Sequence, residues 1–173
     1  MKLKTTEKGF TLVELLVALS IAAFVVGAAS MTTTTMMRLI PQSNNWAIAL
    51  RQVQNTGYWI SRDIMMSKTI LVDPDPGTPT FLTLTVAQPS TVLQPSPPPK
   101  TIVYQFEDMS GSLKRLMRDD QGVGQIMIAE YISTPDTSAN YNSDNCTLTF
   151  TIKATSGNVS VTRQYEATQR VPP

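Results

Sequence analysis

Apolar residues are concentrated in one long run near the N-terminus. Three lysines fall within the first eight residues, and the run from Phe10 to Ala29 that follows carries a single charge, Glu14. Residues 15–37 carry no charge, and Arg38 is the next charged residue. Twenty helical residues are about 30 Å long, which matches the hydrocarbon core of a bilayer. The pattern predicts one membrane-spanning helix, with the lysines in the cytoplasm and the rest of the chain outside.

A second stretch, after Pro41, repeats its apolar residues every three or four positions. This spacing predicts a helix with one apolar stripe, on which the exported part of the chain packs a sheet. The stripe consists of Trp46, Leu50, Val53, Gly57, Ile60 and Ile64, with Trp46 as a core anchor. The polar residues between them, including Arg62 and Asp63, are expected in solvent. Pro41 lacks an N–H donor, so it predicts either a kink in one long helix or the end of the membrane helix.

Beyond Ser67 the period changes from helical to alternating, which predicts antiparallel strands. The expected strands are 69–72, 81–86, 102–106, 113–118, 125–132 and 147–152, with a hairpin turn at 156–158 before a last strand. Residues 88–100 contain five prolines and predict an extended loop. The sequence therefore predicts an α+β fold in which a long helix packs on an antiparallel β-sheet.

The charge balance narrows the class of partner. The net charge is +1, from 14 Lys and Arg against 13 Asp and Glu, whereas nucleic-acid binders normally carry a basic surplus. One small basic cluster, Lys114, Arg115 and Arg118, is followed at once by Asp119 and Asp120, which cancel much of its field. We therefore expect no nucleic-acid partner.

Candidate chemical sites are few. The chain has no histidine, which excludes histidine metal sites and Ser-His-Asp hydrolysis, and its one cysteine, Cys146, excludes an intrachain disulfide. Asn140, Asn142 and Asp144 place oxygen-bearing side chains at alternate positions, like the opening of a calcium loop, but neither the glycine nor the closing glutamate of such a loop follows. We interpret the segment as a polar, mobile loop, with a calcium loop as the alternative. We expect no catalytic residue, no cofactor and no other metal site.

Three interpretations compete for the N-terminal segment. It could be a secretory signal peptide cleaved near residues 27–29, although the apolar run is long for one. It could be a plain membrane anchor, but a carboxylate in a membrane helix costs roughly 2.5–3.5 kcal/mol on insertion scales and so requires a partner. The third interpretation depends on the particular residues around Gly9.

The stretch from Lys8 to Leu19, KGFTLVELLVAL, resembles the class III signal sequence of type IV pilins and type II secretion pseudopilins. The resemblance implies that a prepilin peptidase cuts after Gly9 and N-methylates Phe10. It also implies that Glu14 pairs with the Phe10 amine of a neighbouring subunit during filament assembly. A free amine at a helix N-terminus is a fitting partner for a buried carboxylate.

The same resemblance implies an organisation for the whole chain. Residues 1–9 are a leader that is removed, residues 10–70 are a long helix that spans the membrane over about 10–31, and residues 71–173 are an exported β-rich globular domain. The fold is expected to be pilin-like, in a single-pass protein of the inner membrane that then enters a pilus or pseudopilus. The expected partners are the prepilin peptidase, other pilin or pseudopilin subunits, the inner-membrane assembly machinery and the lipid bilayer.

Two short patterns resemble J-type minor pseudopilins and related minor pilins. One is Tyr104-Gln105-Phe106 followed by Leu113-Lys114-Arg115, similar to a Y-x-F…L-x-R pattern, and the other is Arg62-Asp63 late in the helix. Many major pilins carry a C-terminal disulfide, which one cysteine cannot form. These features favour a minor, assembly-initiating or tip subunit over a major pilin. A membrane-anchored binding domain that does not polymerise and an exported enzyme are the alternatives from other classes.

Overall fold

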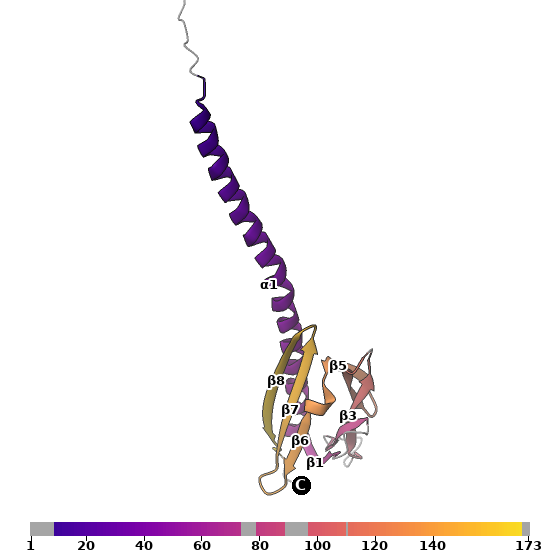
Figure 1. Ribbon diagram of the computed structural model, residues 1–173. Helices are drawn as coiled ribbons and strands as arrows, with labels where there is room; N and C mark the ends of the chain where they lie inside the picture. Colours follow the sequence, from indigo (N-terminus) through magenta and orange to yellow (C-terminus); the bar gives the residue numbers. More distant parts are fainter. Residues whose placement is uncertain (1–8, 74–78, 89–96, 110, 171–173) are drawn as a thin grey trace, which may run out of the picture. The chain divides into compact units, whose positions relative to one another are not determined.

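The computed structural model describes residues 9–73, 79–88, 97–109 and 111–170. Among these residues, the helix α1 runs from Leu12 to Met66 and is followed by eight strands (Figure 1). The chain divides into two compact units, residues 1–42 and residues 43–173, which are described separately below. Residues 1–8 of the expected leader and residues 89–96 of the expected proline-rich loop lie outside the described residues.

The N-terminal unit consists of the first part of α1. Its apolar side chains are exposed along its whole length, and α1 is long and apolar enough to cross a membrane. The serine and threonine hydroxyl groups of this segment are hydrogen-bonded within the helix. Each donates to the backbone carbonyl oxygen four residues earlier, at 2.8–3.0 Å. These residues are Ser20, Ser30, Thr32, Thr33, Thr34 and Thr35. Satisfied hydroxyls remove most of the cost of placing this segment in an apolar environment.

The helix continues through Pro41, which lies inside α1. The interpretation in which the membrane helix ends at Pro41 therefore differs from the structure. Proline still leaves the carbonyl one turn earlier without its helical hydrogen bond, so Pro41 is a weak point of the helix.

The second part of α1 packs on the sheet through one face. This face consists of Ala49, Val53, Thr56, Gly57, Ile60, Asp63 and Ile64, all buried. Four members of the predicted stripe are confirmed, but the prediction that Trp46 is a core anchor is wrong, because Trp46 is 50% exposed. The buried face begins at Ala49, whose small side chain permits a close approach between helix and sheet. Asp63, predicted to be solvated, is fully buried instead.

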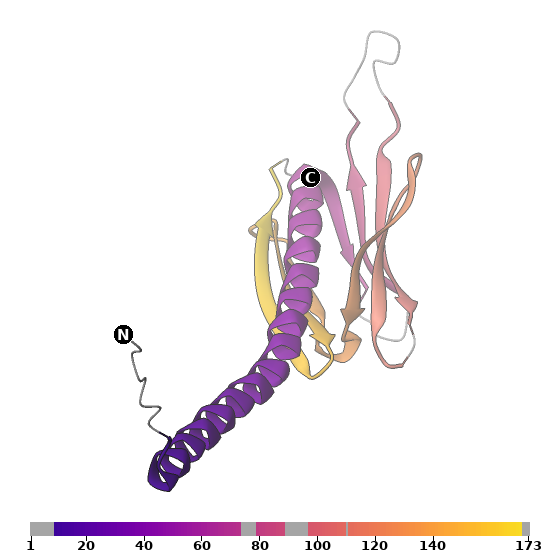
Figure 2. The ribbon, with the colours of Figure 1, turned by 90° about the horizontal axis from the view of Figure 1, so that it is seen from above.

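The eight strands form one curled antiparallel sheet of order β1-β2-β3-β4-β5-β7-β6, with β8 on the other edge of β7. Their bounds are β1 Ser67–Val72, β2 Thr80–Val86, β3 Lys100–Asp108, β4 Lys114–Asp120, β5 Gly124–Ile132, β6 Ser138–Asn142, β7 Thr147–Ser156 and β8 Val159–Thr168, with a 3₁₀ helix at Thr134–Asp136. Within this unit the helix lies between the β7–β8 hairpin and strands β2–β4 (Figure 2). The predicted α+β fold, a long helix on an antiparallel sheet, is confirmed.

The sheet is joined between β5 and β7 by a single residue pair, Ile132 with Ala154. Side chains of α1 bind the backbone of β5 next to this join. The Asn55 amide donates to the carbonyl of Ile128, and the Gln52 carbonyl oxygen accepts the N–H of Glu130 at 3.1 Å. The helix thus supplies hydrogen bonds to β5 where a neighbouring strand would otherwise supply them.

One strand was not predicted. Residues 138–142 form β6, where we expected a polar, mobile loop, so that interpretation is wrong. Ala139 and Tyr141 pack against the core, while the alternate residues Ser138, Asn140 and Asn142 are exposed. The strand covers the core on one side only and carries just two apolar residues, which is why its alternation is hard to recognise in the sequence.

Candidate assembly site and buried charge cluster

The start of α1 is closed by a reciprocal pair of hydrogen bonds between Thr11 and Glu14. Oε2 of Glu14 accepts the backbone N–H of Thr11 at 3.0 Å and its hydroxyl at 2.9 Å, and the N–H of Glu14 donates to Oγ1 of Thr11 at 3.3 Å. This is a capping box, T-x-x-E, which satisfies two of the free N–H groups at a helix start. The T-x-x-E pattern before an apolar run is the sequence signal for this cap.

The residues around the predicted cleavage point lie just outside the helix. Gly9 and Phe10 precede α1 and are both exposed, and a side chain at Gly9 would have no neighbour within 4 Å. The peptide bond between them is therefore in an open stretch of backbone. Within the described part of the chain, Oε1 of Glu14 has no hydrogen-bond partner, and no other carboxylate follows until Asp63.

A second group of charged residues is buried between α1 and the sheet. Oδ2 of Asp63, on α1, accepts hydrogen bonds from the Tyr104 hydroxyl on β3 and from Nε of Arg118 on β4, both at 2.6 Å. Asp63 is fully buried and Arg118 is 6% exposed. Tyr104 and Arg118 are direct neighbours in the β3–β4 register, so the sheet presents both groups to one carboxylate.

The cluster extends along β4 to a second carboxylate. Nη1 of Arg118 donates to Oδ2 of Asp120 at 3.1 Å, and Nζ of Lys100 forms an ion pair with Oδ1 of Asp120 at 2.6 Å. The ring of Trp59 covers the cluster, with the Arg118 guanidinium 5.3 Å from its centroid. Each carboxylate therefore has at least one cationic partner.

The environment fixes the protonation states in the cluster. Burial, with the charge and hydrogen bond of Asp63, raises the pKa of Tyr104 far above its ordinary value. Burial lowers the pKa of Arg118, but the hydrogen bond and charge of Asp63 outweigh it and raise that pKa overall. Burial likewise raises the pKa of Asp120, yet Lys100 and Arg118 lower it below its usual range. The phenol of Tyr104 is therefore neutral, and Arg118 and Asp120 are charged near neutral pH. The hydrogen bonds of the cluster connect the helix to the sheet.

The structure separates the three cations predicted to form a small basic cluster. Lys114 pairs with Asp108 at 2.9 Å, Arg115 pairs with Glu130 at 3.2 Å, and Arg118 is buried. In the Y-x-F…L-x-R pattern, Tyr104 takes a buried position but Arg115 lies at the surface. The buried arginine belongs to a second match, Leu116-Met117-Arg118, three residues later.

The possible calcium residues lie on and beside β6. Asn140 and Asn142 occupy alternate positions of that strand, and Asp144 follows in the turn, where its N–H donates to Oδ1 of Asn142 at 2.9 Å. All three are exposed. Among the residues that the structure describes, no three His, Cys, Asp or Glu side chains are grouped to hold a metal ion.

The fold and the N-terminal segment define a class of protein: an α+β domain carried on a helix that is apolar and long enough to span a membrane. Residues 4–30 match the prokaryotic N-terminal methylation motif. No curated protein and no solved structure matches the chain. The motif and the helix together support a membrane-anchored, exported subunit of the type IV pilin or pseudopilin kind. The motif is that of structural subunits, and it fits processing by a prepilin peptidase and assembly with other such subunits.

Proposed function

We propose that the chain is a non-enzymatic structural subunit of a type IV pilus or type II secretion-like pseudopilus. Prepilin peptidase hydrolyses the bond after Gly9 and methylates the new amine of Phe10. The subunit waits in the inner membrane as a single-pass protein with its globular domain outside. The match of residues 4–30 to the methylation motif carries this proposal, and the capped, apolar start of α1 supports it.

Glu14 has two tasks in this proposal, one for each oxygen of its carboxylate. Oε2 caps its own helix through Thr11, and Oε1 accepts the methylated Phe10 amine of a neighbouring subunit. The Phe10 amine gains the charge of the Glu14 carboxylate, and the apolar surroundings strengthen this pairing. The positive end of the helix dipole at each helix start favours the ionised carboxylate. A subunit that lacks this carboxylate leaves the neighbour's amine unpaired in an apolar site, which is strongly unfavourable.

We further propose that the subunit is a minor pilin, which initiates assembly or occupies the tip, and not the major subunit. The single cysteine and the resemblance of the Tyr104 and Arg62-Asp63 patterns to minor subunits support this assignment. The buried contact of Asp63 with Tyr104 supplies a physical reason for two of these residues to occur together. Counting filaments on cells that lack the gene for this chain would test the assignment as a minor pilin. Deletion of a minor pilin lowers the number of filaments, while the remaining filaments keep their major subunit.

The mass of the protein isolated from its membrane tests the processing. We expect a chain that begins at Phe10 with about 14 Da added to its amine, and a chain that begins at Met1 when the peptidase is absent. A chain that still begins at Met1 when the peptidase is present would contradict the processing and would favour an anchored domain that does not polymerise. A chain that begins at Ser30 would identify a secreted domain and overturn the proposal.

Two matched variants separate the roles of Glu14. Glu14→Gln keeps the cap, because glutamine also serves at this position of a capping box, but loses the charge. Thr11→Ala loses the cap at about 0.5–2 kcal/mol and keeps the charge. We expect Glu14→Gln to abolish incorporation into filaments, measured by shearing and immunoblotting, and Thr11→Ala to reduce it only partly. Normal incorporation of Glu14→Gln would contradict the pairing with Phe10.

A further inference from the structure

Strand β8 leaves one edge of the sheet open over its whole length. It pairs with β7 from Val159 to Thr168 without a register shift, and among the strands that the structure describes it has no second neighbour. Residues of an antiparallel strand alternate in the direction of their backbone groups, so every second residue of β8 directs its N–H and C=O away from β7. A row of outward backbone donors and acceptors fits one kind of occupant, an extended polypeptide.

The other edges of the sheet carry features that hinder the addition of a strand. Strand β1 has a bulge between Ser67 and Thr69, at Lys68, and β6 is only 5 residues long. The edge of β5 is bound by Gln52 and Asn55 of α1. Bulges, lysines and short strands protect edges against pairing. Strand β8 is 10 residues long and has no bulge, no proline and no lysine, so it is the edge best suited to accept a further strand.

Two hollows, of about 360 and 400 Å³, lie between α1 and β8 within the globular unit of residues 43–173. Four consecutive residues of β8, 161–164, line the first hollow. Successive side chains of a strand point to opposite faces, so a hollow that all four line borders the edge of the strand. On the helix side, Trp46, Leu50, Gln54 and Tyr58 recur at intervals of four and form one row along α1.

The dimensions and exposure of this row match a short extended segment. Trp46 and Tyr58 are about 18 Å apart along the helix axis, which is the length of five or six extended residues. Their side chains are 50% and 61% exposed, so both rings offer apolar surface to a partner. A strand added to β8 directs alternate side chains to the same side as Tyr165, whose ring packs on α1 at Gly57. Apolar side chains at those positions cover the two exposed rings.

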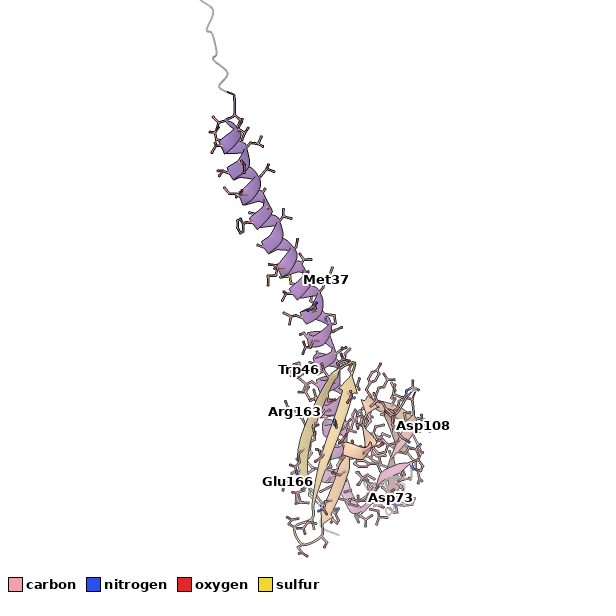
Figure 3. All side chains as sticks on the ribbon, in the orientation of Figure 1. Met37, Trp46, Asp73, Asp108, Arg163 and Glu166 are labelled. Atoms are coloured by element: carbon pink, nitrogen blue, oxygen red, sulfur yellow. The ribbon has the colours of Figure 1, made fainter. Side chains whose placement is uncertain are left out.

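The charge beside the edge restricts the partner further. Arg163 lies between Val161 and Tyr165 on the inner face of β8, is exposed, and forms no ion pair with any residue that the structure describes. Trp46 lies near Arg163, whereas Glu166 lies farther along β8 (Figure 3). No aspartate or glutamate lines either hollow. A neutral or cationic residue opposite Arg163 leaves this cation unpaired under the added strand, whereas an acidic residue pairs with it.

We propose that the free edge of β8 binds an extended segment of a partner polypeptide as an added strand. The segment has apolar side chains at alternate positions over α1 and an acidic side chain opposite Arg163. Backbone hydrogen bonds supply the affinity, and the hollows and Arg163 supply the selectivity. This interaction goes beyond the proposed function, because it requires neither processing at Gly9 nor insertion in a membrane.

A synthetic peptide tests the proposal on the full-length chain in detergent micelles. The probe is acetyl-Val-Thr-Glu-Thr-Leu-Thr-Val-amide, whose glutamate and apolar residues share one face of an extended chain. Trp59→Phe leaves Trp46 as the only tryptophan. We expect saturable binding with a blue-shifted Trp46 emission, and protection of the amides of β8, but not of β1, from hydrogen exchange. No saturable binding at millimolar peptide would overturn the proposal.

Two N-methylated versions of the peptide separate strand addition from binding by side chains alone. Each version carries methyl groups on one of the two alternating sets of amides. Only one set faces β8, so we expect one version to lose about tenfold or more in affinity and the other to bind nearly as the parent peptide does. Equal affinities of the two versions would show that the backbone of the peptide does not pair with β8.

A charge exchange tests the role of Arg163. We expect Arg163→Glu to weaken binding of the probe about fivefold and to strengthen binding of a peptide with lysine in place of the glutamate. The control Lys68→Glu makes the same charge change at an exposed position on β1 and should alter neither affinity. Equal changes in both variants would overturn the selectivity.

Two further measurements keep the outcomes apart. Protection of the β8 amides at high protein concentration without peptide would assign the edge to a second copy of this chain and overturn the proposed partner. Intact mass reports processing at Gly9 independently, so failure of peptide binding is distinguishable from failure of the proposed function.

Discussion

At the scale of single residues, Gly57 lies where the helix closely approaches the sheet. A Cβ placed on Gly57 would overlap the ring of Tyr165 on β8. That ring also stacks on Phe150 of β7, with centroids 5.3 Å apart, and its hydroxyl donates to the carbonyl of Val53 at 3.1 Å. The ring is therefore held from three sides and has little freedom to move away from a larger side chain.

We predict that Gly57→Ala destabilises the globular unit by about 1–3 kcal/mol, because the added methyl group forces the Tyr165 ring out of its packing. Denaturant unfolding in detergent, followed by tryptophan fluorescence, measures the change. Tyr165→Leu should rescue part of the loss in the double variant. Gly27→Ala is the control: a Cβ there has no neighbour within 4 Å, so it should cost nothing. Equal stability of wild type and Gly57→Ala would contradict the close contact.

At the scale of elements, α1 is tied to β3 and β4 by charge as well as by apolar packing. Asp63 is the only carboxylate on the buried face of the helix, and its partners Tyr104 and Arg118 come from adjacent strands. Removing one member leaves the others charged or polar in a buried site. These hydrogen bonds and ion pairs therefore fix the position of the helix along the sheet, which apolar contacts alone specify less sharply.

We predict that Asp63→Asn costs roughly 3 kcal/mol, because Arg118 then loses the closer of its two buried counter-charges and keeps only Asp120. The control is Glu130→Gln, which removes the surface pair with Arg115 and should cost less than about 1 kcal/mol. Thermal unfolding by circular dichroism compares the two variants. Similar losses in both would mean that the buried pair contributes no more than a surface pair.

These elements also separate what the sequence could predict from what it could not. The spacing of Val53, Gly57, Ile60 and Ile64 is enough to predict the buried helix face, since apolar burial follows a simple period. Asp63 was misassigned because its burial depends on Arg118, which is 55 positions away in the sequence. The prepilin motif around Gly9 is local and could be read directly, whereas the Asp63 site required the strand register. Trp46 was misassigned because its spacing places it on the side of the helix that meets the sheet, but the spacing does not determine how far along the helix the buried face extends, and this face begins at Ala49.

At the scale of the whole molecule, acid should weaken the fold through a few specific carboxyl groups. Lys100 and Arg118 lower the pKa of Asp120 against the opposing effect of burial. The Ser133 hydroxyl and Lys153 lower the pKa of Asp136. A carboxyl group with a lowered folded-state pKa stabilises the protein above its unfolded-state pKa, and that contribution is lost as the pH falls through the folded-state pKa.

We predict that stability is nearly constant from about pH 7 to pH 5 and falls between about pH 5 and pH 2. Asp120→Asn should lower stability at pH 7 and flatten part of the acid decline, because it removes one group that titrates. Melting temperature measured across this range, for wild type and variant, gives the comparison. Parallel curves for the two proteins would show that Asp120 does not contribute to the acid dependence.

The single residue pair between β5 and β7 has a consequence for the order in which the chain folds. Among the strand pairs that the structure describes, all except β5–β7 join strands that are consecutive in the chain. Two local meanders, β1–β5 and β6–β8, can therefore form early, since contacts between strands that are consecutive in the chain form faster than non-local ones. The two meanders can pack together only after α1 has docked, because Gln52 and Asn55 of α1 form hydrogen bonds with the backbone of β5 next to its pairing with β7. Because α1 leads directly into β1, this helix is attached to the first meander from the start, so the final step of folding is a local docking of the second meander.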